Sequence, residues 1–230
     1  MFYKEWGKIY KKIVLDFNFK TEEDKNASYI LNDIIKKRNK NYDIKELKKI
    51  IKNKEVIIFG AGPFLSKTIN NNIDIIKDKI KISADGATSA LIEQKIIPDI
   101  IVTDLDGKIS DQINANLKGA ITIIHSHGDN INKLKENVSK FKGEIIGTTQ
   151  IDPTLFQYLY NFGGFTDGDR AVLLAVHYQA KNIYLIGFNF NGLIGKYSFT
   201  KNKRIKIKKL KWCKIILDNI KEKNRIHYLN

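Results

Sequence analysis

From Glu55 onward, short runs of β-branched and apolar residues alternate with longer amphipathic segments, and this alternation constrains the fold more than any other feature. The pattern is typical of βαβ units, in which helices cover both faces of a parallel sheet. We therefore predict an α/β fold with a mostly parallel, doubly wound, Rossmann-like sheet of about six strands. The expected strands are residues 55–59, 80–84, 99–103, 120–124, 144–147 and 182–187.

Apolar residues at helical spacing fill the segments around these strands. The expected helices are residues 64–78, 87–94, 109–118, 130–141, 153–161, 168–180 and 205–222. Residues 1–53 also show helical spacing, with Thr21 and Asp43 as expected N-caps. We therefore divide the chain into an N-terminal helical region (1–53), which packs on the core or completes a neighbouring subunit's site, and an α/β catalytic domain (54–230).

Glycine and polar residues that bind ligands follow nearly every expected strand, whereas the beginnings of the strands show no such enrichment. The carboxyl ends of parallel strands lie at one edge of a sheet, and open α/β sheets bind their ligands there. These residues therefore predict a site along that edge. The segments are Gly60–Leu65, Asp85-Gly86, Asp104–Gly107, His125–Asn130, Thr148–Gln150 and Gly187 with Asn189 and Asn191.

Two carboxylates, Asp104 and Asp106, directly follow the apolar run at residues 100–103, and Gly107 is expected to let the chain turn tightly beyond them. Asp85 adds a third carboxylate at the same edge. Mg²⁺ prefers carboxylate oxygens and would relieve the mutual repulsion of such a cluster. We therefore predict that Asp104, Asp106 and Asp85 bind Mg²⁺; the alternatives are a polar turn after the strand and an N-cap at Asp85.

The sequence Gly60-Ala-Gly62-Pro63 is placed at a strand-to-helix turn, where backbone N–H groups can approach phosphate. Leu65 stands where a dinucleotide fingerprint would have its third glycine, and the lysine of a P-loop is missing as well. A plain tight turn is therefore the alternative to phosphate binding at Gly60, Gly62 and Pro63.

Three further segments offer ligand contacts. Thr166 is expected to cap a helix whose first turn presents Asp167, Asp169 and Arg170 to substrate or phosphate, and the planar guanidinium of Arg170 suits phosphate oxygens. The basic run 201–211 could cover a triphosphate, with Lys208 or Lys209 as candidates. Additional hydrogen-bonding candidates at the strand ends are Gly86, His127, Asp129 and Asn130.

The formal charge of +15 raises the question of a nucleic-acid partner. The lysines are spread over the whole chain, however, and the basic run lacks interleaved aromatic residues, which argues against a reader of single strands. An excess of positive charge also favours polyphosphate ligands. Cys213 is the single cysteine, and no window is apolar enough to span a membrane, so we expect a cytoplasmic protein.

Four motifs in order resemble those of a known family. They are Ala-Asp-Gly-Ala at 84–87, Pro-Asp-Ile-Ile-Val-Thr-Asp-Leu-Asp-Gly at 98–107, His-Ser-His-Gly-Asp-Asn at 125–130 and Gly-Phe-Thr-Asp-Gly-Asp-Arg-Ala at 164–171. Over about residues 55–190 the chain is similar to the archaeal 6-hydroxymethyl-7,8-dihydropterin pyrophosphokinase (MptE-like) family, and more distantly to the catalytic domain of thiamine pyrophosphokinase. That family has a Gly-Pro-Ser-Leu loop, in which Phe64 replaces the serine here.

The resemblance implies transfer of diphosphate from ATP to the primary alcohol of the pterin, with release of AMP, in tetrahydromethanopterin or folate-type pterin biosynthesis. The implied partners are these small molecules and Mg²⁺, and a homodimer is possible. Asp104 and Asp106, with Asp85, would hold Mg²⁺ on the phosphates. Arg170 and a lysine from 201–211 would balance charge on the leaving AMP, and Asp167 would orient or deprotonate the alcohol. Asp129 and Asn130 could instead bind the amide and amino edge of the pterin.

Three alternatives remain open at this point. Thiamine pyrophosphokinase itself is disfavoured because Phe162 and Arg170 replace an aspartate and a lysine of its motif, and because about 40 residues after 190 leave no room for its β-rich domain. A second alternative is another nucleotide-dependent transferase with a similar glycine-proline loop, such as the motility-associated glycosyltransferase-like proteins. A basic nucleic-acid-binding protein is the third, and it predicts salt-dependent binding without ATP turnover.

Overall fold

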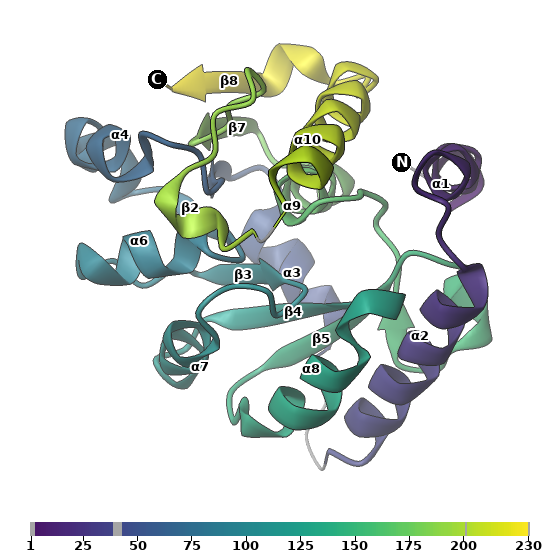
Figure 1. The fold of residues 1–230 in the computed structure, drawn as a ribbon. Helices are drawn as coiled ribbons and strands as arrows, with labels where there is room; N and C mark the ends of the chain where they lie inside the picture. Colours follow the sequence, from purple (N-terminus) through teal and green to yellow (C-terminus); the bar gives the residue numbers. More distant parts are fainter. Residues whose placement is uncertain (1–2, 39–42, 201, 230) are drawn as a thin grey trace.

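The computed structural model describes residues 3–38, 43–200 and 202–229, and these residues form a three-layer α/β fold (Figure 1). Its centre is a single sheet in which every paired strand is parallel to its neighbours. Along the sheet the strands follow the order β6-β5-β4-β3-β2-β1-β7-β8. The strands are β1 (Glu55–Phe59), β2 (Ile80–Ala84), β3 (Ile100–Thr103), β4 (Ile121–Ser126), β5 (Ile145–Thr149), β6 (Leu159–Tyr160), β7 (Asn182–Ile186) and β8 (Ile226–Leu229).

One face of the sheet is covered by four helices. They are α1 (Tyr3–Phe17), α3 (Ile44–Ile51), α9 (Asp167–His177) and α10 (Lys203–Asp218). Alternate strand residues such as Val56, Ile58 and Val102 point into this layer, where they pack with Trp6 of α1 and Leu173 of α9. Burial of each large aliphatic side chain here stabilises the fold by about 1.5–3 kcal/mol.

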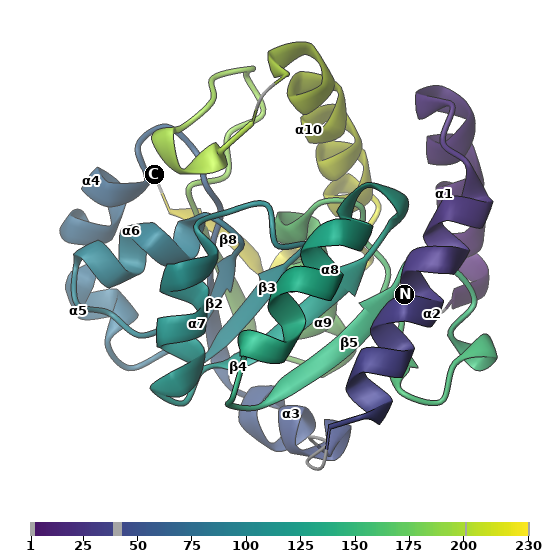
Figure 2. The ribbon, with the colours of Figure 1, turned by 60° about the horizontal axis from the view of Figure 1, so that its bottom comes forward.

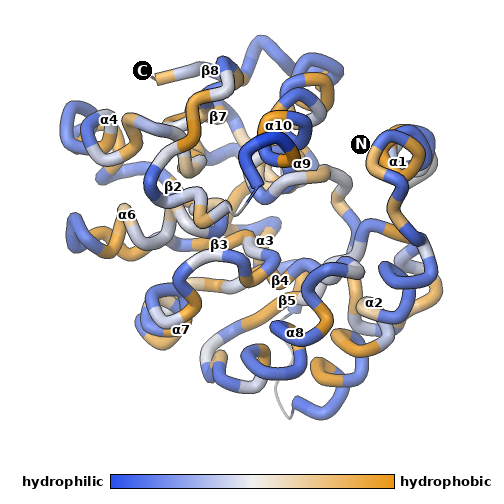
Figure 3. Tube along the Cα trace, in the orientation of Figure 1, coloured by the Kyte–Doolittle hydropathy of each residue, from blue (hydrophilic) through white to orange (hydrophobic). Residues whose placement is uncertain are grey.

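The opposite face carries the remaining helices (Figure 2). There Ile57 and Phe59, the neighbours of Val56 and Ile58, pack on α4 and α6, while Ile124 packs on α2 and α8. The helices are α2 (Thr21–Lys36), α4 (Leu65–Asn71), α5 (Ile73–Ile76), α6 (Ala87–Glu93), α7 (Ile109–Leu117) and α8 (Ile131–Asn137). Figure 3 shows the resulting pattern, with apolar residues mostly turned to the sheet and polar ones mostly outward.

The predicted fold class is confirmed, with corrections in detail. The six predicted strands are present within about two residues of their expected bounds, and within the described residues β6 and β8 extend the sheet to eight. The helix expected at 153–161 is wrong: Asp152 caps a short 3₁₀ turn at Pro153–Leu155, and the chain then adds β6 to the edge of the sheet. The helix expected at 64–78 is divided at Asn72 into α4 and α5.

The N-terminal region is helical, as predicted, and its helices pack on both faces of the sheet: α1 and α3 on one, α2 on the other. Asp43 caps α3, because its side chain accepts from the N–H of Lys45. The expected cap at Thr21 is wrong, since Thr21 is already the first residue of α2 and Lys20 precedes it without a side-chain bond. The boundary after residue 53 stays a prediction.

None of the described helices has the length and hydrophobicity that a membrane-spanning helix requires.

Candidate active site

A pocket of about 180 Å³ opens at the predicted edge of the sheet, beyond the carboxyl ends of β1, β2, β3 and β7. Gly60, Asp85 and Asp104 reach it directly from β1, β2 and β3. Its other walls are the beginning of α9, the segment 187–200 after β7, and the face of α10 that carries Lys206 and Lys209. The location agrees with the rule for open α/β sheets.

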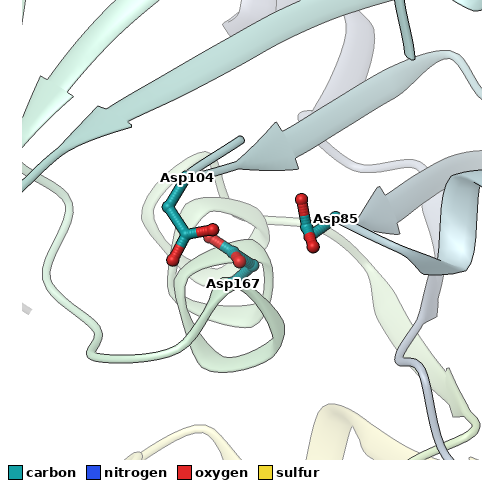
Figure 4. A group of neighbouring side chains, drawn as sticks. All are labelled: Asp85, Asp104 and Asp167. Atoms are coloured by element: carbon teal, nitrogen blue, oxygen red, sulfur yellow. The ribbon is translucent and has the colours of Figure 1, made fainter. Parts of the chain in front are cut away.

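Three carboxylates meet at this pocket (Figure 4). Asp85 follows β2, Asp104 follows β3 and Asp167 begins α9, and one carboxylate oxygen from each lies within 4.8 Å of those from the other two. We call Asp85, Asp104 and Asp167 the acidic cluster. Such a set of hard oxygen donors matches what Mg²⁺ and similar cations bind.

The backbone that carries the acidic cluster is strained at two residues. Asp85 has a φ of 43° and Leu105, directly after Asp104, has a φ of 67°. An aspartate tolerates the left-handed region, but a buried leucine there is an outlier that the surrounding structure must maintain. The expected tight turn is therefore made at Leu105. Gly107 is needed for space, because a Cβ there would lie 2.9 Å from the Asp85 carboxylate.

Asp85 is held by three donors on one oxygen. Its Oδ1 accepts from Thr103 Oγ1 at 2.7 Å, from Gln112 Nε2 at 2.9 Å and from the N–H of Gly107 at 3.0 Å. Burial and the nearby charge of Asp104 nevertheless raise the pKa of Asp85 to about 6. The carboxylate is thus fixed in position, but its charged form is poorly stabilised. A bound cation would stabilise that charged form. The alternative role of Asp85 as an N-cap is excluded, since Gly86 precedes α6 and no side chain caps it.

Asp104 is the member of the cluster whose pKa is lowered. Burial alone would raise its pKa, but His127 donates a hydrogen bond from Nε2 to Oδ2 at 3.3 Å, and the charges of Arg170 and Lys209 add to this, so the pKa of Asp104 is lowered. The other imidazole nitrogen, Nδ1, accepts from the N–H of Asp129. These two bonds define the tautomer in which Nε2 carries the proton.

The pKa of Asp167 is shifted in the opposite direction from that of Asp104. Burial, followed by the charge of Asp104, raises its pKa well above the ordinary range, although Arg170 Nη1 donates to its Oδ1 at 3.0 Å. Asp167 and Arg170 both lie in the first turn of α9. Thr166 is the N-cap of this helix, as predicted, and the Asp169 carboxylate accepts hydrogen bonds from the N–H groups of Phe165 and Thr166 at 2.7 Å. Asp169 is therefore a capping residue rather than a ligand contact.

Asp106 lies apart from the acidic cluster. Its side chain is half exposed and forms an ion pair with Lys133 of α8, although Asp106 still borders the pocket. The sequence placed Asp106 beside Asp104 in the metal site, but the turn at Leu105 directs the two side chains differently. Asp167, which the sequence assigned to the alcohol, occupies the third position of the cluster.

The glycines of the Gly60–Pro63 turn serve close packing. A Cβ on Gly62 would lie 2.4 Å from the carbonyl oxygen of Gly187, and one on Gly187 would lie 2.1 Å from that of Gly60. The N–H groups of Gly60 and Gly62 donate to the carbonyl oxygens of Ile186 and Gly187, and phosphate binding at Gly60, Gly62 and Pro63 stays a prediction. Gly60 and Gly62 still line the pocket. Gly86 also lines it, and a Cβ at this position would lie 1.9 Å from the carbonyl oxygen of Tyr197, so only glycine fits there.

A second, smaller pocket of about 30 Å³ lies on the other side of Asp104. Phe19 and Lys20, which precede α2, and Asp24 of its first turn line it, and so do two of the predicted site residues, His127 and Asp129. Asp104, Phe165 and Lys209 border both pockets, and Arg170 borders the smaller one. Within the acidic cluster, Asp104 therefore lies between the two pockets.

Asn130 does not face either pocket. It is buried, and its amide nitrogen donates to the carbonyl oxygens of Asp104 and His125 at 2.9 and 2.7 Å, while its oxygen accepts from the N–H of His127. Asn130 thereby joins the ends of β3 and β4. Asp129 is exposed at the rim of the smaller pocket.

Within the basic run, the structure separates the two candidate lysines. Lys209 faces both pockets and lies 5.7 Å from the centre of the Phe165 ring, whereas Lys208 forms an ion pair with Asp16 of α1 at 2.9 Å. Lys206 also borders the larger pocket. Part of the positive charge of the chain is thus directed at the site.

Several residues of the site could not be found from the sequence. Phe188, Phe190, Tyr197 and Phe199 build the apolar wall of the larger pocket from an irregular segment without helical or strand periodicity. Gln112 and Thr103 support Asp85 from an ordinary helix and strand. The sequence feature that could have indicated the apolar wall is the pair Phe188 and Phe190, which follows a buried strand and is separated by Asn189.

Comparison with known proteins agrees with these motifs. The family model described as 6-hydroxymethylpterin diphosphokinase MptE-like matches residues 32–193. Two proteins named 6-hydroxymethyl-7,8-dihydropterin pyrophosphokinase are similar over 98% of this chain. The one from Methanocaldococcus jannaschii is 42% identical with 98% of its own length covered, and the one from Pyrococcus furiosus is 44% identical with 96% covered.

A third protein of that name, from Methanothermobacter thermautotrophicus, is 40% identical over 84% of this chain and 81% of its own. Among solved structures, the MAf glycosyltransferase from Magnetospirillum magneticum AMB-1 aligns with a TM-score of 0.35 and 17% identity over 60% of this chain and 23% of that one. The family model covers well over half of the chain, and the relatives match it nearly end to end. The chain therefore belongs to the MptE-like 6-hydroxymethylpterin diphosphokinase family.

Proposed function

We propose that this protein transfers a diphosphate group from ATP to 6-hydroxymethyl-7,8-dihydropterin, which gives the pterin diphosphate and AMP. The observation that carries the proposal is the match to two pyrophosphokinases of this name over 98% of the chain, at 42% and 44% identity. The acidic cluster at the carboxyl edge of the sheet supports it independently, because diphosphate transfer requires a site that holds and neutralises a polyphosphate.

The acidic cluster fits a divalent cation, and we propose that it holds Mg²⁺. Burial and mutual repulsion raise the pKa of Asp85 and of Asp167, which means that the charged forms of these carboxylates are destabilised. A bound cation would stabilise the charged forms. Asp85 and Asp104 would supply the protein ligands, while Asp167, beside them in the cluster, would remain available to act on the substrate. When bound, Mg²⁺ would offset the negative charge of the phosphate oxygens.

Positive side chains surround the cluster where phosphates would lie. Arg170 borders the smaller pocket, Lys206 the larger one, and Lys209 both. A triphosphate that passes Asp104 would contact cations on either side, and Lys209 at the junction is placed to hold the phosphate that becomes part of AMP.

The larger pocket has the character of a site for a flat ring. Phe188, Tyr197 and Phe199 provide apolar and aromatic surface, while Asn189 and Asn202 provide hydrogen-bonding groups at its border. Ligand sites commonly combine such apolar walls with a few polar groups. We assign this pocket to the nucleoside of ATP and the acidic cluster to its phosphates.

In the proposed reaction the pterin hydroxyl oxygen attacks the β-phosphorus of ATP. The bond from that oxygen to the β-phosphorus forms, the bond from the β-phosphorus to the oxygen shared with the α-phosphorus breaks, and AMP leaves with the electron pair. Asp167 accepts the hydroxyl proton, since its raised pKa makes it a stronger base than an exposed aspartate. Arg170 orients Asp167 through their hydrogen bond.

A product assay tests the proposal. The protein is incubated with ATP, Mg²⁺ and either 6-hydroxymethyl-7,8-dihydropterin or thiamine, and AMP and the product mass are measured. We expect AMP only with the pterin, together with a pterin product heavier by one diphosphate group. AMP formation with thiamine alone, or absence of AMP with both acceptors, would show that the proposed substrate is wrong.

A further inference from the structure

A buried carboxylate of the N-terminal region, Asp24, lies outside the acidic cluster and is connected to it. Asp24 belongs to the first turn of α2 and is 4% exposed. Its Oδ2 accepts from the hydroxyl of Tyr10 on α1 at 2.5 Å, and its Oδ1 accepts from the backbone N–H of Gly128 at 2.8 Å. Burial of a polar side chain is costly unless it is hydrogen-bonded, and both oxygens of Asp24 have a partner, so the side chain serves a specific contact.

The Gly128 contact fixes the turn that carries His127. Gly128–Asn130 form a short 3₁₀ turn after β4, and α2 approaches Gly128 so closely that a Cβ there would lie 2.7 Å from the Cβ of Glu23. His127 immediately precedes this turn, and its imidazole donates to Asp104. A shift of the turn therefore moves the donor that holds one carboxylate of the acidic cluster.

We propose that Asp24 is a positioning residue of the active site: by anchoring Gly128 to α2, it holds the His127 imidazole against Asp104. The N-terminal helices then complete the site without touching the reacting atoms. The proposal rests on the proposed function only in taking Asp104 as a metal ligand. Residues that orient a ligand from behind typically change metal affinity by about 10- to 100-fold when they are replaced.

The test uses the full chain with three substitutions on α2. Asp24→Leu removes both acceptors at similar volume, whereas Asp24→Asn keeps a carbonyl oxygen for the Gly128 N–H. Ser28→Ala is the matched control: Ser28 is buried on the same helix and bonded to Ser126, Thr149 and the backbone carbonyl of Asp24, so its replacement removes a buried contact of α2 but leaves the Asp24 carboxylate and its bond to Gly128 in place. Each protein is titrated with Mn²⁺ alone, followed by electron paramagnetic resonance, without nucleotide or pterin.

We expect Asp24→Leu to weaken Mn²⁺ binding by about tenfold, and Asp24→Asn and Ser28→Ala to stay within about threefold of the wild type. Because Asp24 acts through His127, Asp24→Leu should have no further effect in a His127→Gln background. If Asp24→Leu does not fold, Asp24→Ser replaces it, since the shorter side chain leaves a polar group but does not span to Gly128.

Nitrogen-15 NMR of the imidazole rings gives a second readout that a merely structural role would not change. In the wild type the His127 ring should show a single tautomer with the proton on Nε2, as its bonds to Asp104 and Asp129 require. Asp24→Leu should average the two tautomers, while Ser28→Ala should not. His127→Gln identifies the signal among the four histidines of the chain.

Three results would each overturn the proposal: an unchanged Mn²⁺ affinity and His127 spectrum in Asp24→Leu, an equal loss in Ser28→Ala, or independent effects of the Asp24 and His127 substitutions. Failure of the proposed function has a different signature, because the wild type would then release no AMP with the pterin, whereas the Mn²⁺ and NMR measurements would still decide the role of Asp24.

Discussion

Arg170 donates from Nη1 to Oδ1 of Asp167 at 3.0 Å, and both side chains are more than four-fifths buried in the first turn of α9. The guanidinium also borders the smaller pocket, so one side chain links the carboxylate that we assign as base to the region that we assign to phosphate. A planar group with several donors can serve both contacts at once, which an ammonium group cannot.

Replacement of Arg170 by lysine should therefore lower kcat/KM by about 100-fold, because the bond to Asp167 or the contact with phosphate is lost. Initial rates of AMP release measure the effect. Arg38→Lys is the matched control: Arg38 is partly buried and bonded to the carbonyl oxygens of Phe141 and Gly143, away from both pockets, and its replacement should leave kcat/KM unchanged. A rate for Arg170→Lys near that of the wild type would exclude the shared role.

The two aspartates after β3 should differ in importance. Asp104→Asn removes an ionised member of the acidic cluster and should reduce turnover by about 100-fold or more. Asp106→Asn only breaks a half-exposed ion pair with Lys133, so we expect turnover within about threefold of the wild type. Mg²⁺-dependent AMP release distinguishes them, and a large loss in Asp106→Asn would restore the metal role that the sequence indicated.

The neighbouring lysines of α10 offer a similarly direct comparison. Lys209→Ala should raise the KM for ATP by about tenfold, because Lys209 borders both pockets beside Asp104. Lys208→Ala removes the ion pair with Asp16 and should leave the KM for ATP within about twofold. Equal effects of the two substitutions on KM would show that the pockets do not contain the triphosphate.

The raised pKa of Asp85 predicts how stability depends on pH in the metal-free protein. The folded-state pKa of about 6 exceeds the ordinary value of 3.8, so the unfolded chain releases the proton first as the pH rises. The contribution of Asp85 to stability is therefore fully present below about pH 4 and is lost as the pH rises through about 6. The difference of about two pKa units corresponds to about 3 kcal/mol.

Asp85→Asn lacks this titration but keeps an oxygen for Thr103, Gln112 and Gly107. Between about pH 4 and pH 7, its free energy of unfolding should therefore rise relative to that of the wild type by up to about 3 kcal/mol in the presence of a chelator. Urea unfolding at each pH measures the difference. A difference that is constant with pH would show that Asp85 has an ordinary pKa in the folded protein.

The sequence predicted the six strands β1–β5 and β7 well because each is a short run rich in β-branched residues and largely buried, which leaves few alternatives. It missed β6 because Leu159 and Tyr160 form only two pairs with β5, too short a segment for any periodicity. Asp152 with Pro153 gave the start signal of a helix, and only the edge of the sheet decides that the chain continues as a strand.

The candidate site was predictable as far as its residues follow strands. Asp85 and Asp104 were identified because the carboxyl edge of a parallel sheet collects them, and Asp167 was identified from the expected helix start at Thr166. The grouping was not predictable, since it depends on the φ angle of Leu105, which directs Asp104 inward and leaves Asp106 to Lys133. The contribution of Asp24 was equally inaccessible, because its partner Gly128 is distant in sequence.

The smaller pocket has consequences for the order of folding. Lys20 and Lys209, near opposite ends of the described chain, line it together, and the parallel sheet between them consists of long-range pairings. Contacts of such high sequence separation form slowly and late. A partly folded sheet would therefore carry the aspartates of β2 and β3 before any enclosed cavity exists around them. The appearance of ligand binding during refolding should then lag behind the formation of the sheet, so that the active site itself reports the last step of folding.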